Sequence, residues 1–267
     1  MKLYNLLFIT LCLLFISCKN TQKEDNSSEK LTSETIESKI NEKFPETIKI
    51  IPIEHASTII EAEGVSIYID PTGGAKPYTK MNKADMILIT DIHGDHMNTD
   101  TLDSLDLAKA KVIVPAAVAE KLPAKYTEQL VIINNGETKE IKGVTIEAIP
   151  MYNLREEALK FHDKGRGNGY VITIAGERLY FSGDTEDIPE MRALKNIDRA
   201  FVCMNLPYTM TVESAADAVL EFKPKSVYPY HYRGTEGLSD VRKFKEIVNT
   251  GDKSIEVIQL DWYPKMK

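Results

Sequence analysis

Two histidines and two aspartates lie within six positions in the segment Asp91-Ile92-His93-Gly94-Asp95-His96. Imidazole nitrogen and carboxylate oxygen are ligands that zinc and other borderline divalent metals accept. The apolar run 86–90 predicts a buried strand directly before them, and Gly94 lets the following loop fold back so that the side chains converge. A polar turn with a helix cap would use the same residue types. Four metal-capable side chains at one strand end favour a metal site.

Two later apolar runs also end in residues that can bind a metal. Leu179–Ser182 leads into Gly183-Asp184-Thr185, and Ser226–Tyr230 leads into His231. A single strand-end Asp usually caps a helix, and a lone His is usually structural, so each signal is weak by itself. Together the three strand ends predict one pocket along the edge of a sheet.

The elements that must position these residues are short runs of β-branched and aromatic residues, bounded mostly by Gly, Pro, Asn or Asp. Strands are predicted at 48–53, 58–62, 65–70, 86–90, 111–114, 130–133, 144–149, 170–175, 179–182, 200–203, 226–230 and 255–260. Helices are predicted at 98–109, 116–122, 188–194, 213–222 and 239–248. Tight hairpins are expected at 61–65 and 174–178. Early hairpins and later inserted helices predict an α/β (α+β) fold of two facing sheets with helices outside.

The composition is that of an ordinary globular protein, with 267 residues, 43% hydrophobic and 27% charged. With 33 basic and 40 acidic residues the net charge is −7. Affinity for nucleic acid comes mainly from Lys and Arg that displace counterions from phosphate. We therefore expect a small-molecule substrate and no nucleic acid.

The first residues read as an export signal. Lys2 is followed by an apolar stretch from Leu6 to Ile16, too short to prefer a permanent membrane span. Phe15-Ile16-Ser17-Cys18 resembles the lipobox of bacterial lipoproteins; an ordinary signal peptide cut nearby is the alternative. We predict a signal peptide at 1–17, a lipidated Cys18 with a flexible tether at 18–44, and one domain at 45–267. The protein would then be exported and membrane-anchored by its lipid, in the periplasm or at the cell surface.

Only Cys203 remains in the folded part after this processing, so no disulfide framework is expected. It lies in the apolar run 200–204, which favours a buried strand residue over a nucleophile.

The motifs resemble those of a known group of enzymes. Thr90-Asp91-Ile92-His93-Gly94-Asp95-His96 resembles the Thr-His-x-His-x-Asp-His signature of the metallo-β-lactamase fold hydrolases, Ser182-Gly183-Asp184-Thr185 resembles their Gly-Asp-Thr motif, and His231 matches their final His. The similarity runs from Ile51 to Tyr232. It implies an αββα sandwich of two mixed sheets with helices outside.

Two early segments narrow the resemblance. His55-Ala56-Ser57 and Ile69-Asp70-Pro71 are similar to the branch that includes ascorbate-6-phosphate-lactonase-like and other broad metal-dependent hydrolases. The motif set is specific for the fold and poorly specific for the substrate.

The resemblance also implies ligand roles. It assigns one metal site to Asp91, His93 and a third His, and a second site to Asp95, His96 and His231, with Asp184 bridging two ions, most simply two Zn²⁺. Asp91 replaces the usual first His, and its carboxylate makes that site a harder set of ligands. Manganese or iron then suits the site as well as zinc does; the alternative is that the site is empty.

The third histidine is displaced in this chain. Asn153 stands where that residue is usual, after Ile149-Pro150-Met151-Tyr152. We expect His162 to be supplied by the following loop; a surface histidine is the alternative.

The implied chemistry is attack by a metal-activated hydroxide on an ester, lactone, thioester or phosphodiester, with Asp95 as the catalytic residue that orients the water. Tyr208 is either a proton donor or a packing residue. Lys164, Arg166 and Arg233 either anchor an anionic substrate group or are simply solvated. The competing hypothesis is a non-catalytic periplasmic binding protein on the same fold, with a degenerate metal site.

Overall fold

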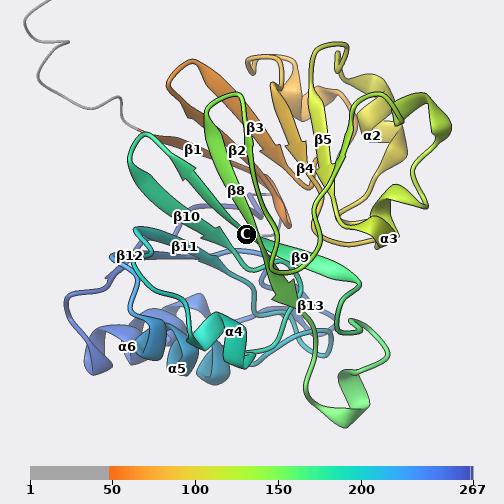
Figure 1. The fold of residues 1–267 in the computed structure, drawn as a ribbon. Helices are drawn as coiled ribbons and strands as arrows, with labels where there is room; N and C mark the ends of the chain where they lie inside the picture. Colours follow the sequence, from red (N-terminus) through yellow and green to blue (C-terminus); the bar gives the residue numbers. More distant parts are fainter. Residues whose placement is uncertain (1–47, 265, 267) are drawn as a thin grey trace, which may run out of the picture. The chain divides into compact units, whose positions relative to one another are not determined.

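Two β-sheets pack face to face between two layers of helices (Figure 1). The structure is a computed structural model that describes residues 48–264 and 266. Within that range the first sheet has the strand order β1 (Lys49–Glu54), β2 (Ser57–Ala62), β3 (Val65–Ile69), β4 (Met86–Leu88), β5 (Lys111–Val114) and β6 (Leu130–Ile132). The second has the order β15 (Glu256–Val257), β12 (Ser226–Pro229), β11 (Arg199–Val202), β10 (Glu177–Phe181), β9 (Gly167–Ile174), β8 (Val144–Met151) and β7 (Thr138–Ile141). The predicted two-sheet sandwich is confirmed.

Each sheet combines antiparallel and parallel pairs. Antiparallel hairpins join β1 to β2 to β3 and β7 to β8, while β3 to β6 and β10, β11, β12 and β15 run parallel. Both predicted hairpins turn on two residues with positive φ, Glu63-Gly64 at 50° and 72° and Ala175-Gly176 at 50° and 74°. Such turns match the twist of the strands that they join.

One strand of the second sheet was not predicted. β7 reads Thr-Lys-Glu-Ile, and its first three side chains are exposed. It lies at the edge of the sheet, so it needs no apolar pattern, and the turn at Lys142-Gly143 fixes its pairing with β8.

The apolar runs are continuous because helices cover the outer face of both sheets. In β2 the neighbours Ile59 and Ile60 are both fully buried, yet Ile60 joins the core between the sheets and Ile59 joins the cluster outside the first sheet. Side chains alternate between the two faces of a strand, so both faces must be apolar.

The helices of the two outer layers differ in length. The first sheet carries α2 (Thr99–Ser104) and α3 (Ala116–Ala119), and the second carries α4 (Pro189–Arg192), α5 (Val212–Phe222) and α6 (Val241–Gly251) (Figure 1). Three 3-10 turns are η1 (Lys76–Tyr78), η2 (Ala124–Tyr126) and η3 (Glu156–Ala158). α5 and α6 fill their predicted ranges closely. The other three are shorter than predicted; α3, for example, ends before Pro123, which disfavours helix in the residue before it.

The strands that carry the predicted ligands end at one edge of the sandwich. The loops after β4, β10 and β12 meet there, together with Asp70, which directly follows β3. The described residues belong to one compact unit, Pro45–Lys267. The predicted signal peptide, Cys18 and tether lie outside the described residues. In the part of the chain that is described, no helix has the length and apolarity needed to cross a membrane.

Candidate metal centre

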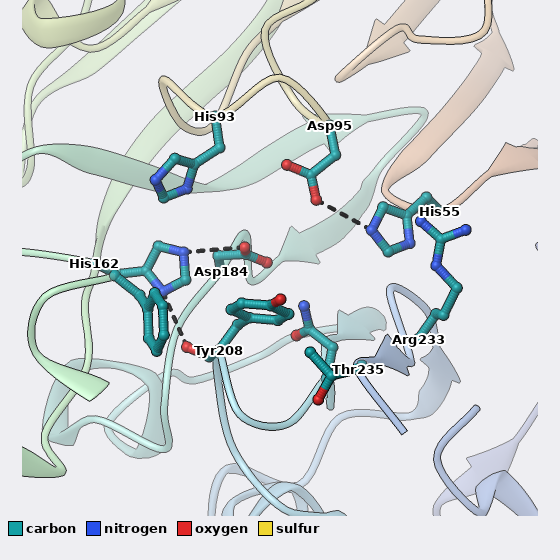
Figure 2. A pocket seen from close by; sticks show the side chains of 11 residues that line it. His55, His93, Asp95, His162, Asp184, Tyr208, Arg233 and Thr235 are labelled. Atoms are coloured by element: carbon teal, nitrogen blue, oxygen red, sulfur yellow. Dashed lines mark hydrogen bonds and ion pairs between the residues drawn. The ribbon is translucent and has the colours of Figure 1, made fainter. Parts of the chain in front are cut away.

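A cavity of about 500 Å³ opens where these loops meet (Figure 2). Its lining residues are His55, His93, Asp95, Phe161, His162, Asp184, Asn205, Tyr208, Arg233, Gly234 and Thr235. Figure 2 shows His93 and His162 on one side of this cavity and His55 and Arg233 on the other. The volume suits a small molecule.

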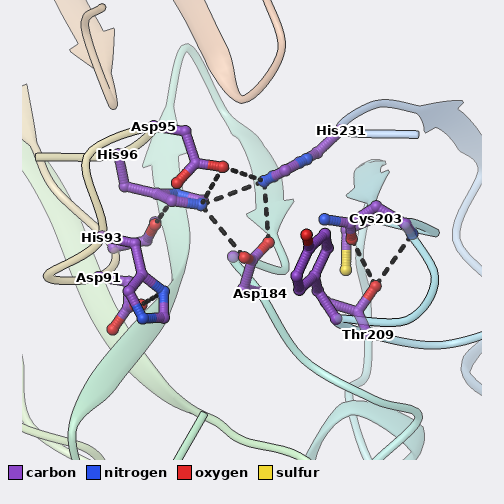
Figure 3. A network of polar contacts seen from close by, with 12 residues as sticks. Asp91, His93, Asp95, His96, Asp184, Cys203, Thr209 and His231 are labelled. Atoms are coloured by element: carbon purple, nitrogen blue, oxygen red, sulfur yellow. Dashed lines mark hydrogen bonds and ion pairs between the residues drawn. The ribbon is translucent and has the colours of Figure 1, made fainter. Parts of the chain in front are cut away.

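Three imidazole groups converge on the carboxylate of Asp184 (Figures 2 and 3). The Nε2 atoms of His96 and His162 lie 3.3 Å and 3.1 Å from Asp184 Oδ2. The Nε2 atom of His231 lies 3.0 Å from Oδ1. All four side chains are buried. Four ligand-type groups that meet at one point form a donor set that can bind a cation.

The hydrogen bonds of His96 fix which of its nitrogens is free. Its Nδ1 lies 2.8 Å from Asp70 Oδ2 and 2.9 Å from Thr90 Oγ1. Because Thr90 Oγ1 itself donates to Asp70, the proton on His96 Nδ1 is directed to the carboxylate. Nε2 is therefore the nitrogen that faces Asp184, where it can bind a proton or a cation. A carboxylate behind a histidine in this way is the usual support of a metal-ligating imidazole.

His162 is oriented in the same sense by a different partner. Both N–H groups of the Asn153 side chain donate to backbone carbonyls, those of Ala158 and Tyr208. His162 Nδ1, 3.1 Å from the Tyr208 carbonyl, must then be the protonated nitrogen and donate to it. The backbone N–H of Asn153 also donates to the backbone carbonyl of His162, and this bond folds the loop back on itself. Asn153, at the usual ligand position, thus holds the histidine that reaches the site.

Asp91 lies beneath this cluster and is fully buried. Its Oδ1 accepts from Arg166 Nε at 3.0 Å, and its Oδ2 accepts from Arg166 Nη2 at 2.9 Å. His93 Nδ1 lies 2.7 Å from the same Oδ2. Burial raises the pKa of Asp91, but His93, His96 and Arg166 outweigh it, and the net pKa lies below the ordinary value. Asp91 is therefore an ionised carboxylate that a guanidinium already engages.

A second set of contacts links His55 to the cluster. His55 Nε2 lies 3.1 Å from Asp95 Oδ2, and its Nδ1 lies 2.5 Å from the Tyr263 hydroxyl. The backbone carbonyl of His55 accepts from the N–H of His231. Burial, and next His231, lower the pKa of His55 to about 4. His55 is thus a neutral imidazole between the C-terminal segment and Asp95.

The backbone is strained at three of these positions. His55, Asp70 and His231 have φ values of 54°, 43° and 45°, in the left-handed region that side chains disfavour. Such conformations cost on the order of 1–3 kcal/mol each and persist where the surroundings enforce them. Here they aim one nitrogen or carboxylate of each residue into the cluster.

The ionisation of the cluster shows what a cation would replace. Burial lowers the pKa of His96, but Asp184, Asp70 and Asp95 outweigh it and raise that pKa well above the ordinary value. Burial raises the pKa of Asp184, but His231, His96 and His162 hold it well below the ordinary range. Without an ion, the proton that His96 retains helps to balance these carboxylates. A divalent ion does the same while accepting the nitrogen lone pairs.

The residues present fit a metal. Two buried atoms of the cluster, Asp184 Oδ1 and His231 Nδ1, have no hydrogen-bond partner among the described residues, although His231 Nε2 is close to Asp184 Oδ1. Within the described residues three groups could each hold an ion, and the first and the last share His231: His55, Asp95 and His231; Asp91, His93 and His162; His96, Asp184 and His231.

The structure brings together every predicted ligand, namely Asp91, His93, Asp95, His96, His162, Asp184 and His231. Tyr208 lines the cavity, as a proton donor would, and also packs against Phe161. Cys203 is buried, and burial raises the pKa of its thiol to about 11, which removes it as a nucleophile.

Three supporting residues were not among the predicted ligands. Asp70 follows β3 at the same sheet edge, and that position was a usable signal. His55, like Asp70, stands in a segment that resembles the family; it was predicted to lie near the site, either as a candidate functional residue or as a structural hydrogen-bond donor, and was given no ligand role. Tyr263 carried no signal, because its contact with His55 spans 208 positions.

Comparisons with known proteins agree with this architecture. Residues 49–231 match a family model described as "Beta-lactamase superfamily domain". A UPF0173 metal-dependent hydrolase from Pyrococcus abyssi is 30% identical over 222 residues, which cover 79% of this chain and 96% of that relative. A second, from Thermococcus kodakarensis, is 31% identical over 224 residues, with the same two coverages.

Solved structures give the same result. One from Parabacteroides distasonis has 38% identity and a TM-score of 0.71, covering 79% of this chain and 92% of that one. The metallo hydrolase Igni18 from Ignicoccus hospitalis has 25% identity and a TM-score of 0.67, covering 80% of this chain and 95% of that one. The chain belongs to the β-lactamase superfamily and is a metal-dependent hydrolase of the metallo-β-lactamase fold.

Proposed function

We propose that this protein hydrolyses an ester, lactone, thioester or phosphodiester bond with a metal-activated hydroxide. The proposed centre holds two divalent ions, with zinc as the first choice and manganese or iron as alternatives. The proposed ligands are Asp91, His93 and His162 for one ion and Asp95, His96 and His231 for the other, with Asp184 shared between them.

The observation that carries this proposal is the convergence of three Nε2 atoms within 3.3 Å of the Asp184 carboxylate. His96 and His162 each use Nδ1 to donate to a fixed acceptor, Asp70 and the Tyr208 carbonyl respectively. Their Nε2 lone pairs have no structural use except to bind a cation or a proton. A cluster preserved only for packing would not need this arrangement.

The chain's own groups supply the remaining chemistry. A bound divalent ion lowers the pKa of a coordinated water from about 15.7 to about 7. The Asp95 side chain is 42% exposed and its Oδ2 lies 3.6 Å from His231 Nε2, so it faces both ligands and cavity. It would orient the attacking water, with His55 holding it in place. Tyr208 would donate a proton to the leaving group.

The test is metal stoichiometry by elemental mass spectrometry on the full chain, wild type beside Asp184→Ala and His96→Ala. Asp163→Ala is the matched control, because Asp163 is exposed in the same loop as His162. We expect about two ions per chain in the wild type and the control, fewer in both variants, and turnover of a lactone, thioester or phosphodiester panel that follows metal content. One ion would restrict the proposal to the Asp184 cluster. No ion after reconstitution with zinc, manganese and iron would favour the non-catalytic binding protein.

We also propose that the protein is exported and anchored by lipid on Cys18, on the strength of the segment that resembles a lipobox. Labelling of growing cells with an alkyne fatty acid should mark the wild type and spare Cys18→Ser. Equal labelling of both would refute the anchor.

A further inference from the structure

Three cations near the predicted site were candidates to bind a negatively charged substrate, and the structure separates them. Lys164 is paired with Glu190 at 2.8 Å. Arg166 is committed to Asp91 by two hydrogen bonds and is not among the residues that line the cavity. Arg233 lines the cavity, is exposed, and forms no ion pair with any carboxylate in the described residues. Its guanidinium instead lies 5.8 Å from the centre of the Tyr263 ring.

Arg233 is held close to the metal-binding cluster by its place in the chain. It follows the ligand His231 by two residues and opens β13 (Arg233–Gly234), which pairs with β14 (Gly237–Leu238). Thr235, at the tip of this hairpin, lines the same cavity. In Figure 2 Arg233 reaches the level of His55, on the far side of the cavity from His162.

The hairpin that carries Arg233 is fixed rather than loose. The N–H of Thr235 donates to the carbonyl of Leu206 at 3.2 Å. A Cβ atom added to Gly234 would lie 1.8 Å from that same carbonyl oxygen, so the two backbones are in direct contact and only glycine fits. A rigid support matters because a charge placed in advance loses little freedom when it binds a ligand.

The charge of the loaded cavity has a definite sign. Its lining includes two carboxylates, Asp95 and Asp184, and one cation, Arg233. The two divalent ions of the proposed centre more than balance these two carboxylates and one bound hydroxide, and Arg233 adds to the positive charge that is left. A neutral substrate would gain nothing from that excess, whereas an anionic one would be attracted and oriented.

We infer that the substrate carries an oxyanion, a carboxylate or a phosphate monoester, on the side of the scissile bond that faces β13, and that Arg233 binds this group. The inference rests on the proposed hydrolytic function and adds a substrate class to it. Arg233 is a binding residue in this scheme: its guanidinium donates two hydrogen bonds to the oxyanion, in the bidentate geometry that suits both groups.

The first experiment compares two esters of the same length on the metal-loaded full chain. The neutral probe is 4-nitrophenyl hexanoate and the anionic probe is mono-(4-nitrophenyl) adipate, so both acyl chains have six carbons and differ only in their last group. We expect kcat/KM to favour the adipate ester by about tenfold, the scale of one hydrogen-bonded charge. In Arg233→Ala this ratio should fall toward one, chiefly through KM, and Arg233→Lys should keep part of it. Arg242→Ala removes a charge from the exposed surface of α6 and should leave the ratio unchanged.

The second experiment does not depend on activity. The midpoint of thermal unfolding of the metal-loaded protein is measured with valerate and with butylphosphonate, in the wild type and in Arg233→Ala, so that binding of the anion to the metal alone is common to both. A rise that Arg233→Ala reduces supports the inference, and the anion with the larger Arg233-dependent rise identifies the group. No Arg233-dependent rise with either anion, or ester hydrolysis with a ratio near one in the wild type, would overturn it. Failure of all hydrolysis beside an Arg233-dependent rise would instead refute the proposed function and leave an anion-binding site.

Discussion

Replacing Arg166 by methionine should destabilise the metal-free protein by about 3 kcal/mol, and added metal should recover most of that loss. Asp91 is fully buried and the Arg166 side chain is 16% exposed, so the pair is shielded from water. Breaking a buried ion pair by removing one partner costs about 3–5 kcal/mol, because a charge is left without compensation. We take the lower end of this energy range because His93 Nδ1, 2.7 Å from Asp91 Oδ2, remains as a partner of the carboxylate.

The assay is urea unfolding in EDTA, with the thermal midpoint as a second measure. For a domain of this size about 3 kcal/mol corresponds to a fall of about 6–12 °C. Arg178→Met is the matched control: its partner is Glu147, and the two side chains are 31% and 28% exposed, so we expect a loss of about 1 kcal/mol or less. The loss should also shrink in acid, since the lowered pKa of Asp91 makes its stabilisation present above its ordinary pKa and lost as the pH falls through its folded pKa.

Metal and a second substitution separate the possible causes. With the guanidinium gone, a divalent ion can take both Asp91 oxygens, and an ion at one hundred times its Kd restores about 2.7 kcal/mol. Asp91→Asn in the Arg166→Met background should restore stability without metal, because it removes the stranded charge. A loss as small as that of Arg178→Met would refute the reasoning. Rescue by Asn without rescue by metal would show that Asp91 is no ligand.

Two further predictions concern His96. Asp70→Asn should weaken metal binding by about 10- to 100-fold, measured by competition with a chromogenic chelator, because Asp70 holds His96 Nδ1. The control Asp85→Asn, at the opposite end of β4, should leave the metal affinity unchanged. Equal affinities in both variants would contradict the role of Asp70. Because the folded-state pKa of His96 is raised, its contribution to stability is complete below the ordinary histidine pKa and is lost as the pH rises through the raised value. Urea titrations should therefore show that the metal-free protein loses stability in alkali and that the metal-loaded protein loses less. If the free energy of unfolding falls equally with pH in both forms, the role of the His96 proton is refuted.

The sequence predicted what depends on local pattern. The runs before Asp91, Asp184 and His231 are buried strands whose composition reports covered faces, and the ends of such strands meet at one sheet edge. That is why three weak signals from distant segments could be combined into one site. Edge strand β7 escaped because its exposed side chains leave no apolar pattern.

The contacts that tune the site could not be predicted, because they join segments with no shared pattern. The Arg166 pair with Asp91 spans 75 positions and depends on the path of the loop between β8 and β9. The sequence left Arg166 equivalent to Arg233 as a substrate anchor, and only the fold shows that one charge is engaged and the other is open.

The loop that supplies His162 couples ligand placement to the shape of the substrate cavity. His162 Nδ1 donates to the backbone of Tyr208, while the Tyr208 ring lines the cavity and packs against Phe161 with 5.1 Å between ring centres. A change that moves the Tyr208 backbone therefore also moves His162 Nε2 relative to Asp184. It alters metal affinity together with substrate affinity. Among the described residues Arg233 forms no hydrogen bond or ion pair with a proposed ligand, so replacing its side chain should act chiefly on substrate binding. Opposite walls of one cavity thus carry separable functions, which is why the ratio of two esters can isolate Arg233 when metal content stays constant.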